Sequence, residues 1–95
     1  MGLDLRRYRS FAYKKVVLLN DQWTAFDPEF RFSHLLIVNA GAGGIQFGIN
    51  AQDPARGGEL NSGENLTFDD CDGNKVFIKG TAGTTIRVWV WKGRL

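Results

Sequence analysis

Short stretches in which apolar and polar residues alternate, each ended by a turn signal, constrain the fold of this 95-residue chain most strongly. The last of them, TTIRVWVW at residues 84–91, places Ile86, Val88 and Val90 on one face of an extended strand. Turn signals recur about every 8–12 residues, a spacing typical of a β-sandwich or small barrel. We therefore predict one all-β domain, an antiparallel β-sandwich that is jelly-roll-like or immunoglobulin-like, with about six to eight short strands.

Several segments have a specific expectation. Strand pairing is expected from about Tyr13, and the aromatic-rich residues 22–32, broken at Asp27-Pro28, predict short edge strands or an irregular corner. The apolar run that ends at Val38 and the alternating strand at 45–49 predict a β-hairpin around a glycine-rich loop. Residues 51–63 are interpreted as a polar loop. Further strands are expected at 64–70, at 74–80 and from Thr84.

The final strand raises a question about its other face. Arg87, Trp89 and Trp91 share that face, although a small antiparallel sheet usually has polar side chains outside. Each tryptophan can bury ~150–250 Å², so leaving both exposed would forgo several kcal/mol. Two alternatives follow: the domain itself covers both faces of the strand, or another chain covers the tryptophans.

Charge is distributed unevenly along the chain. Residues 1–15 hold five Lys/Arg against one Asp, a net +4, whereas residues 16–95 hold seven Lys/Arg against nine Asp/Glu, a net −2. We predict a basic N-terminal arm at residues 1–12 and a domain at 13–95, and this split indicates intermolecular contact. The arm could contact an acidic protein, bind phosphates, or be a terminus without a partner. We expect no nucleic-acid groove, because few basic residues recur in the body.

The chain is poor in the residues that most catalytic and metal sites need. Cys71 and His34 are its single cysteine and histidine, so no disulfide within the chain and no cysteine-based metal cluster is expected. Three aspartates beside Cys71 should raise the pKa of its thiol and reduce its reactivity. His34 lacks a second ligand or a triad pattern and is interpreted as structural or interfacial. We predict no catalytic residue, no metal and no cofactor.

Other motifs fail at specific positions. The glycine-rich residues 41–44 resemble the start of a dinucleotide fingerprint, but Gln46 stands where glycine is needed and a strand follows instead of a helix. An EF-hand loop would need aspartate at Phe68 and glutamate at Lys79. Asp53, Glu59 and Glu64 could pair for glycoside hydrolysis, but their spacing is equally that of a solvated loop.

Targeting signals are not recognised either. The longest apolar run has four residues, far below the ~20 that span a bilayer. The N-terminus has no apolar segment of a signal peptide, so we expect synthesis in the cytoplasm and no membrane partner.

One resemblance covers roughly residues 35–92. The elements that carry it are Leu35–Asn50, the G-E-x-L-T-F stretch that begins at Gly63, the strand Val76–Gly80, and Thr85–Trp91. This order is similar to that of small β-sandwich proteins of tailed-phage virions, which include head decoration (cement) proteins and small tail or fibre components. The resemblance implies a non-enzymatic building block in symmetric copies whose arm extends over a neighbour.

The resemblance, taken with the basic arm and the tryptophans, implies a virion structural protein, most specifically a capsid decoration protein that is a dimer or trimer and binds the major capsid protein or another virion protein. The expected contact residues are Arg6, Arg7, Tyr8, Arg9, Phe11, Trp89 and Trp91. Aromatic and arginine side chains of this kind often dominate binding energy. Alternatives are a small tail or fibre component and a carbohydrate-binding module that stacks sugars on Trp23, Trp89 or Trp91.

Overall fold

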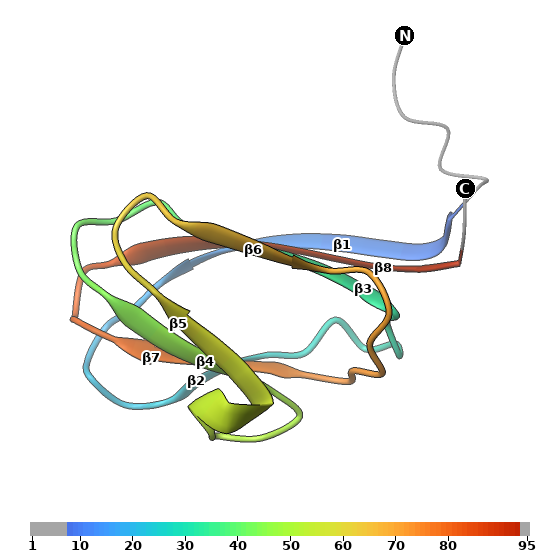
Figure 1. The fold of residues 1–95 in the computed structure, drawn as a ribbon, viewed down its shortest axis with the longest axis horizontal. Coiled ribbons are helices and arrows are strands. Elements are labelled where there is room, and N and C mark those ends of the chain that lie inside the picture. The colour runs from blue at the N-terminus through green and yellow to red at the C-terminus, as the bar shows by residue number, and fades with distance from the viewer. Residues whose placement is uncertain (1–7, 94–95) are drawn as a thin grey trace, which may run out of the picture.

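Eight strands form two facing antiparallel sheets within residues 8–93, the part of the chain that the computed structural model describes; of residues 8 and 9 it describes the backbone alone (Figure 1). The strands are β1 (Tyr8–Val17), β2 (Thr24–Phe26), β3 (His34–Asn39), β4 (Ile45–Ile49), β5 (Gly57–Leu60), β6 (Asn65–Phe68), β7 (Val76–Gly80) and β8 (Thr85–Gly93). A short 3-10 helix, η2 (Pro54–Arg56), precedes β5. The predicted all-β antiparallel sandwich is confirmed.

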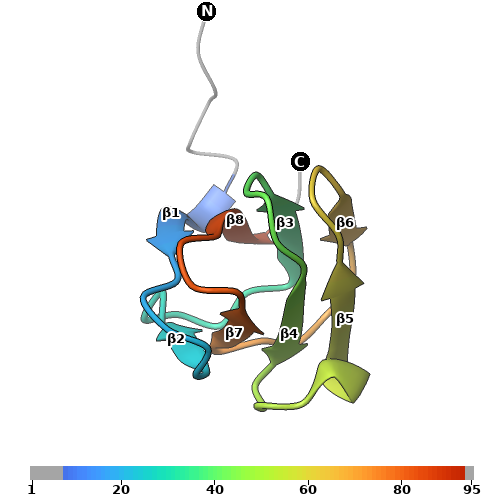
Figure 2. The ribbon, with the colours of Figure 1, turned by 90° about the vertical axis from the view of Figure 1, so that its left-hand side faces the viewer.

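The strand order decides which kind of sandwich this is. One sheet has the order β1-β8-β3-β6 and the other β2-β7-β4-β5, as the two rows in Figure 2 show. The first strand therefore pairs with the last, the second with the seventh, the third with the sixth, and the fourth with the fifth. This is the jelly-roll arrangement of eight strands in two sheets, so the immunoglobulin-like alternative is excluded.

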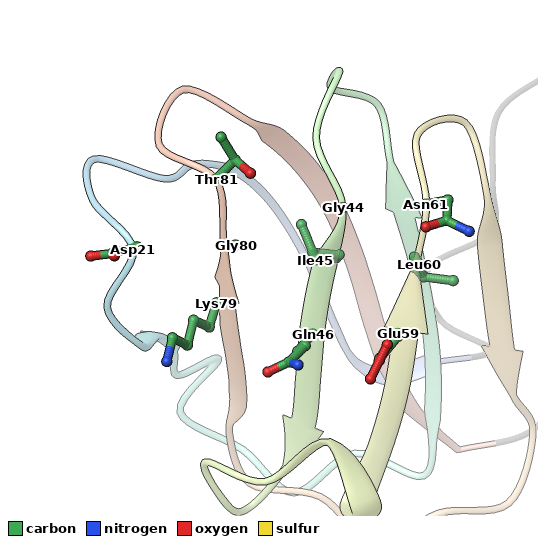
Figure 3. Close-up of a pocket in the computed structure, with 10 residues that line it drawn as sticks. All are labelled: Asp21, Gly44, Ile45, Gln46, Glu59, Leu60, Asn61, Lys79, Gly80 and Thr81. Atoms are coloured by element: carbon green, nitrogen blue, oxygen red, sulfur yellow. The ribbon is translucent and has the colours of Figure 1, made fainter.

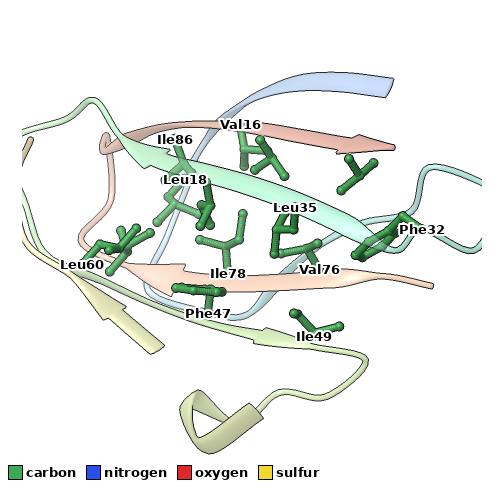
Figure 4. Close-up of a cluster of buried hydrophobic side chains, with 14 residues drawn as sticks. Val16, Leu18, Phe32, Leu35, Phe47, Ile49, Leu60, Val76, Ile78 and Ile86 are labelled. Carbon is green, nitrogen blue, oxygen red and sulfur yellow. The ribbon is translucent and has the colours of Figure 1, made fainter. Parts of the chain in front are cut away.

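The hydrophobic core fills the space between the two sheets (Figure 4). Each strand contributes the side chains of one face, because neighbouring residues of a strand point in opposite directions. Ile86, Val88 and Val90 of β8 are 0% exposed, which confirms the core face expected from the alternation. Phe47 of β4 is also 0% exposed, and its ring meets that of Phe68 edge-on at a centroid distance of 6.1 Å.

Two expectations about connections are wrong. Residues 31–50 do not form a β-hairpin, because β3 and β4 belong to different sheets and the loop between them crosses from one sheet to the other. The expected polar loop at 51–63 contains strand β5, which pairs with β4. A hairpin and a connection between sheets produce the same apolar alternation, so the sequence pattern could not separate them. The β5 strand begins Gly57-Gly58, where glycine lets it approach β4 closely: a Cβ on Gly57 would clash with the Phe47 carbonyl oxygen.

The start of β1 also differs from expectation. Pairing with β8 begins at Tyr8, opposite Gly93, and not at about Tyr13. Residues 8–12 of the predicted arm therefore belong to a strand, and residues 1–7 lie outside the described part. The pattern hid this strand because the outer face of β1 carries Phe11 and Tyr13 while the inner positions hold Ala12 and Lys14.

Within residues 8–93, no helix has the length and apolar character that crossing a membrane requires.

Candidate functional site

The outer face of the β1-β8-β3-β6 sheet gathers aromatic side chains from three strands. The register places Trp89 between Tyr13 of β1 and Leu36 of β3. The same register places Trp91 one row further along, between Phe11 of β1 and His34 of β3. We call this surface the aromatic face, and it consists of Phe11, Tyr13, His34, Leu36, Trp89 and Trp91.

Cross-strand contacts hold the indole rings in place. The ring of Tyr13 lies 5.0 Å from that of Trp89 at an interplanar angle of 39°. The imidazole of His34 stacks on Trp91 at 5.3 Å and 7°, and its Nε2 lies 3.2 Å from the carbonyl oxygen of Gly93. Such aromatic cross-strand pairs each add about 0.5–1.5 kcal/mol beyond area burial. His34 thus has the structural environment that the sequence analysis expected.

The sequence left two alternatives for the tryptophans, cover by the domain itself or cover by another chain, and their observed burial lies between the two. Trp89 and Trp91 are half-buried, and their neighbours in the register are side chains of the same sheet, on the face turned away from the core. Beside them, Phe11 and Tyr13 of β1 remain 41% and 42% exposed. The domain therefore covers part of each indole, and a contiguous aromatic surface stays open to solvent. Monomeric proteins rarely leave such patches without a use.

The charged side chains at outward strand positions of this sheet are basic within residues 8–93. Lys15 and Arg87 are paired in the row next to Tyr13 and Trp89, and Arg87 Nη1 donates a hydrogen bond to the Tyr13 hydroxyl at 3.1 Å. Outward strand positions of this sheet within residues 8–93 carry no Asp or Glu. A surface that combines aromatic groups with positive charge is complementary to an acidic partner.

The structure brings together some of the predicted contact residues. Phe11, Trp89 and Trp91 share the aromatic face. Tyr8 and Arg9 lie in β1 by their backbone, and their side chains are outside what the structure describes. Arg6 and Arg7 lie outside the described residues.

Sequence reasoning missed two members of the face, Tyr13 and Leu36, and it did not place His34 beside Trp91. Alternation shows which residues of one strand share a side, but not which strand lies next to it. Tyr13 and Trp89 are far apart in the chain and meet only through the β1–β8 register. The sequence offered one signal, which was that Phe11 and Tyr13 occupy alternate positions of the segment that forms β1.

Two of the three carboxylates considered for glycoside hydrolysis form local hydrogen bonds. Asp53 accepts a hydrogen bond from Ala55 N at the start of η2, and Glu64 accepts one from Asn61 N. Burial raises the pKa of the half-buried Cys71 thiol, and the nearby Asp70 and Asp72 carboxylates raise it further, as expected in direction. No group of three metal-ligating side chains occurs among the residues that the structure describes.

An exposed ion pair joins the β2–β3 and β6–β7 connections. Arg31 Nε lies 3.0 Å from Asp72 Oδ1, and Nη2 contacts both carboxylate oxygens. The hydrogen bonds and charge of Arg31 lower the pKa of Asp72, and the charge of Lys92 lowers it further. Because the folded-state pKa is lowered, the pair stabilises the fold above the unfolded pKa and this contribution is lost as pH falls through the folded pKa.

The Arg31→Ala substitution should therefore raise the pKa of Asp72 toward the ordinary value of about 3.9. An NMR titration of the Asp72 carboxyl carbon measures the shift. Arg56→Ala, which removes an arginine from η2, is the matched control and should leave the Asp72 pKa in place. An unchanged pKa in Arg31→Ala would show that the ion pair does not persist in solution. The effect on stability should be small, since both side chains are exposed.

The fold and the aromatic face together define a β jelly-roll domain with a basic, aromatic outer sheet surface. No protein-family model, no curated protein and no solved structure matches this chain.

Proposed function

We propose that this protein is a non-enzymatic structural protein that binds an acidic protein surface through its aromatic face, and that the partner is the shell of a virus particle. The observation that carries the proposal is the aromatic face itself: two half-buried tryptophans flanked by Phe11 and Tyr13, which are 41% and 42% exposed. Further burial of these rings against a partner would supply binding energy, and tryptophan, tyrosine and arginine are the side chains that most often dominate it.

Charge supports an acidic partner. Lys15 and Arg87 border the aromatic face, and residues 1–15 as a whole carry a net +4. Carboxylates on the partner would pair with these cations at the rim and increase the association rate, while the aromatic rings supply the buried centre. In this proposal Arg6, Arg7 and Arg9 also pair with carboxylates of the partner.

The virion setting has separate support. It comes from the resemblance of residues 35–92 to small phage virion proteins, together with the jelly-roll topology, which viral capsid domains use. Assembly as a dimer or trimer is part of the same proposal, and the mass of the purified chain in solution measures it.

Co-sedimentation of the purified chain with capsid shells from the same source tests the proposal. The wild-type chain should bind to saturation. Trp89→Ala should weaken binding by about 30-fold or more, because truncation of a tryptophan hot spot costs about 2 kcal/mol or more. Gln46→Ala, on the outer face of the other sheet, is the control and should bind as the wild type does.

Three outcomes would contradict or redirect this proposal. Equal binding by Trp89→Ala would remove the aromatic face from the contact. Absence of wild-type binding to heads, with binding to tails, would favour a tail component. Steep loss of binding with salt, together with competition by single-stranded DNA, would favour nucleic acid instead.

Truncation tests the arm separately. Because β1 begins at Tyr8, the appropriate deletion removes residues 1–7 and keeps the β1–β8 pairing intact. The shortened chain should fold with an unchanged melting temperature and occupy shells about tenfold more weakly, through the loss of two arginines that would pair with carboxylates. Substitution of Arg6 and Arg7 by glutamine in the full chain is the matched control for charge alone. Unchanged occupancy in both variants would refute a role for these residues.

A further inference from the structure

A second surface feature lies on the outer face of the β2-β7-β4-β5 sheet. It is an open depression with a volume of about 450 Å³, lined by side chains from three strands and three loops (Figure 3). The polar lining side chains are Asp21, Gln46, Glu59, Asn61, Lys79 and Thr81. In a sandwich the outer faces of the two sheets point in opposite directions, so this depression is turned away from the aromatic face.

The strand register arranges the central side chains in a row. Gln46 of β4 is paired with Glu59 on one side and Lys79 on the other, so the three share the outer face over about 10 Å. Trp23 extends the row: it lies just before β2, whose Thr24 pairs with Ile78, and its ring centroid is 6.0 Å from Lys79 Nζ. An indole, an ammonium, an amide and a carboxylate thus follow one another across the sheet.

The polar groups of this row have hydrogen-bonding capacity to spare. Within residues 8–93, the side chains of Gln46, Glu59 and Lys79 form no hydrogen bond and no ion pair with other protein groups. Glutamine can donate and accept, a carboxylate only accepts, and an ammonium only donates. The depression therefore offers both donors and acceptors, closely spaced and directed outward.

The composition of the lining selects one class of ligand. Asp21 and Glu59 outnumber the cation Lys79, so phosphate and other anions gain no net attraction. Polar side chains dominate the exposed lining, which disfavours an apolar ligand. A neutral ligand dense in hydroxyl groups, each able to donate and accept, matches the mixture of groups present.

We propose that this depression binds neutral carbohydrate. Hydroxyl groups of the sugar would bond to Gln46, Glu59 and Lys79, and a sugar ring would lie against the apolar body of the Trp23 indole. This inference is independent of the proposed protein contact, because it uses the opposite sheet. A chain bound to a shell through its aromatic face would present the depression to the surroundings.

The test is an NMR titration of the ¹⁵N-labelled full chain with neutral oligosaccharides of glucose, galactose and N-acetylglucosamine. Saturable shifts should appear at Gln46, Glu59, Lys79 and the Trp23 indole N–H, with a dissociation constant on the order of 1 mM. Gln46→Ala and Glu59→Ala should each weaken binding about tenfold, since each removes a hydrogen bond to the sugar. Trp89→Ala, on the aromatic face, should bind sugar as the wild type does.

Each contrary result is decisive. Absence of shifts with every oligosaccharide would overturn the proposal, as would shifts confined to the aromatic face. Equal shifts at the depression with inorganic phosphate would show an anion site instead. Unweakened binding by Gln46→Ala and Glu59→Ala would likewise remove the site. A negative result in the sugar titration would not change the result of the co-sedimentation with shells. Each proposal can therefore be refuted without the other.

Discussion

Replacing Phe47 with alanine should lower the free energy of unfolding by about 3–5 kcal/mol. The ring is 0% exposed between the sheets and meets Phe68 edge-on. The glycines of β5 approach it so closely that a Cβ on Gly57 would lie 2.8 Å from its ring. Backbone packed this tightly cannot collapse into the cavity that the substitution leaves, so the cost should reach the upper part of that range.

Thermal and denaturant unfolding measure this effect. Because a domain of this size has a total stability of about 5–15 kcal/mol, the variant should lose more than about 10 °C in melting temperature. Leu19→Ala is the matched control: Leu19 is 87% exposed, and its truncation should change stability by no more than about 0.5 kcal/mol. A Phe47→Ala variant within about 1 kcal/mol of the wild type would contradict the packing described for β4 and β5.

Replacing Asn39 with alanine should cost about 3 kcal/mol. The Asn39 side chain is 0% exposed at the end of β3, where its Nδ2 donates to Gly43 O at 2.7 Å and to Leu60 O at 3.1 Å. Its Oδ1 accepts from Gly41 N at 3.0 Å. One amide therefore joins the β3–β4 loop to the end of β5, and alanine would remove this partner from three backbone groups that lie in buried or partly buried positions.

Asn50 offers a control with nearly the same bonding but without burial. Its side chain donates to Asp72 O and accepts from Asn74 N and Lys75 N, and the residue is exposed with a φ of 65°. Asn50→Gly preserves that backbone conformation and lets water replace the lost partners, so it should cost less than about 1 kcal/mol. Equal losses in Asn39→Ala and Asn50→Gly would show that burial is not what makes Asn39 important.

The sequence alone could not predict that Asn39 joins the β3–β4 loop to β5. An asparagine before a glycine-rich loop predicts a turn, and the loop is there. That its amide also bonds to Leu60, in a strand that the sequence analysis interpreted as a loop, depends on where β5 lies. The depression has the same origin, because Gln46, Glu59 and Lys79 come from three strands that only the register aligns.

By itself, the sequence determined that this chain forms short strands and which side of the last strand faces the core. Extended backbone turns each side chain to the opposite side from the one before it, so Val88 and Trp89 are assigned to different faces by local geometry alone. Only the tertiary structure decided that Tyr13, His34 and Trp89 form one surface, and that every connection except the one between β4 and β5 crosses from one sheet to the other. The physical reason is that each strand finds its partner through many weak contacts with segments that are distant in the chain. The sequence of one short segment does not specify those contacts.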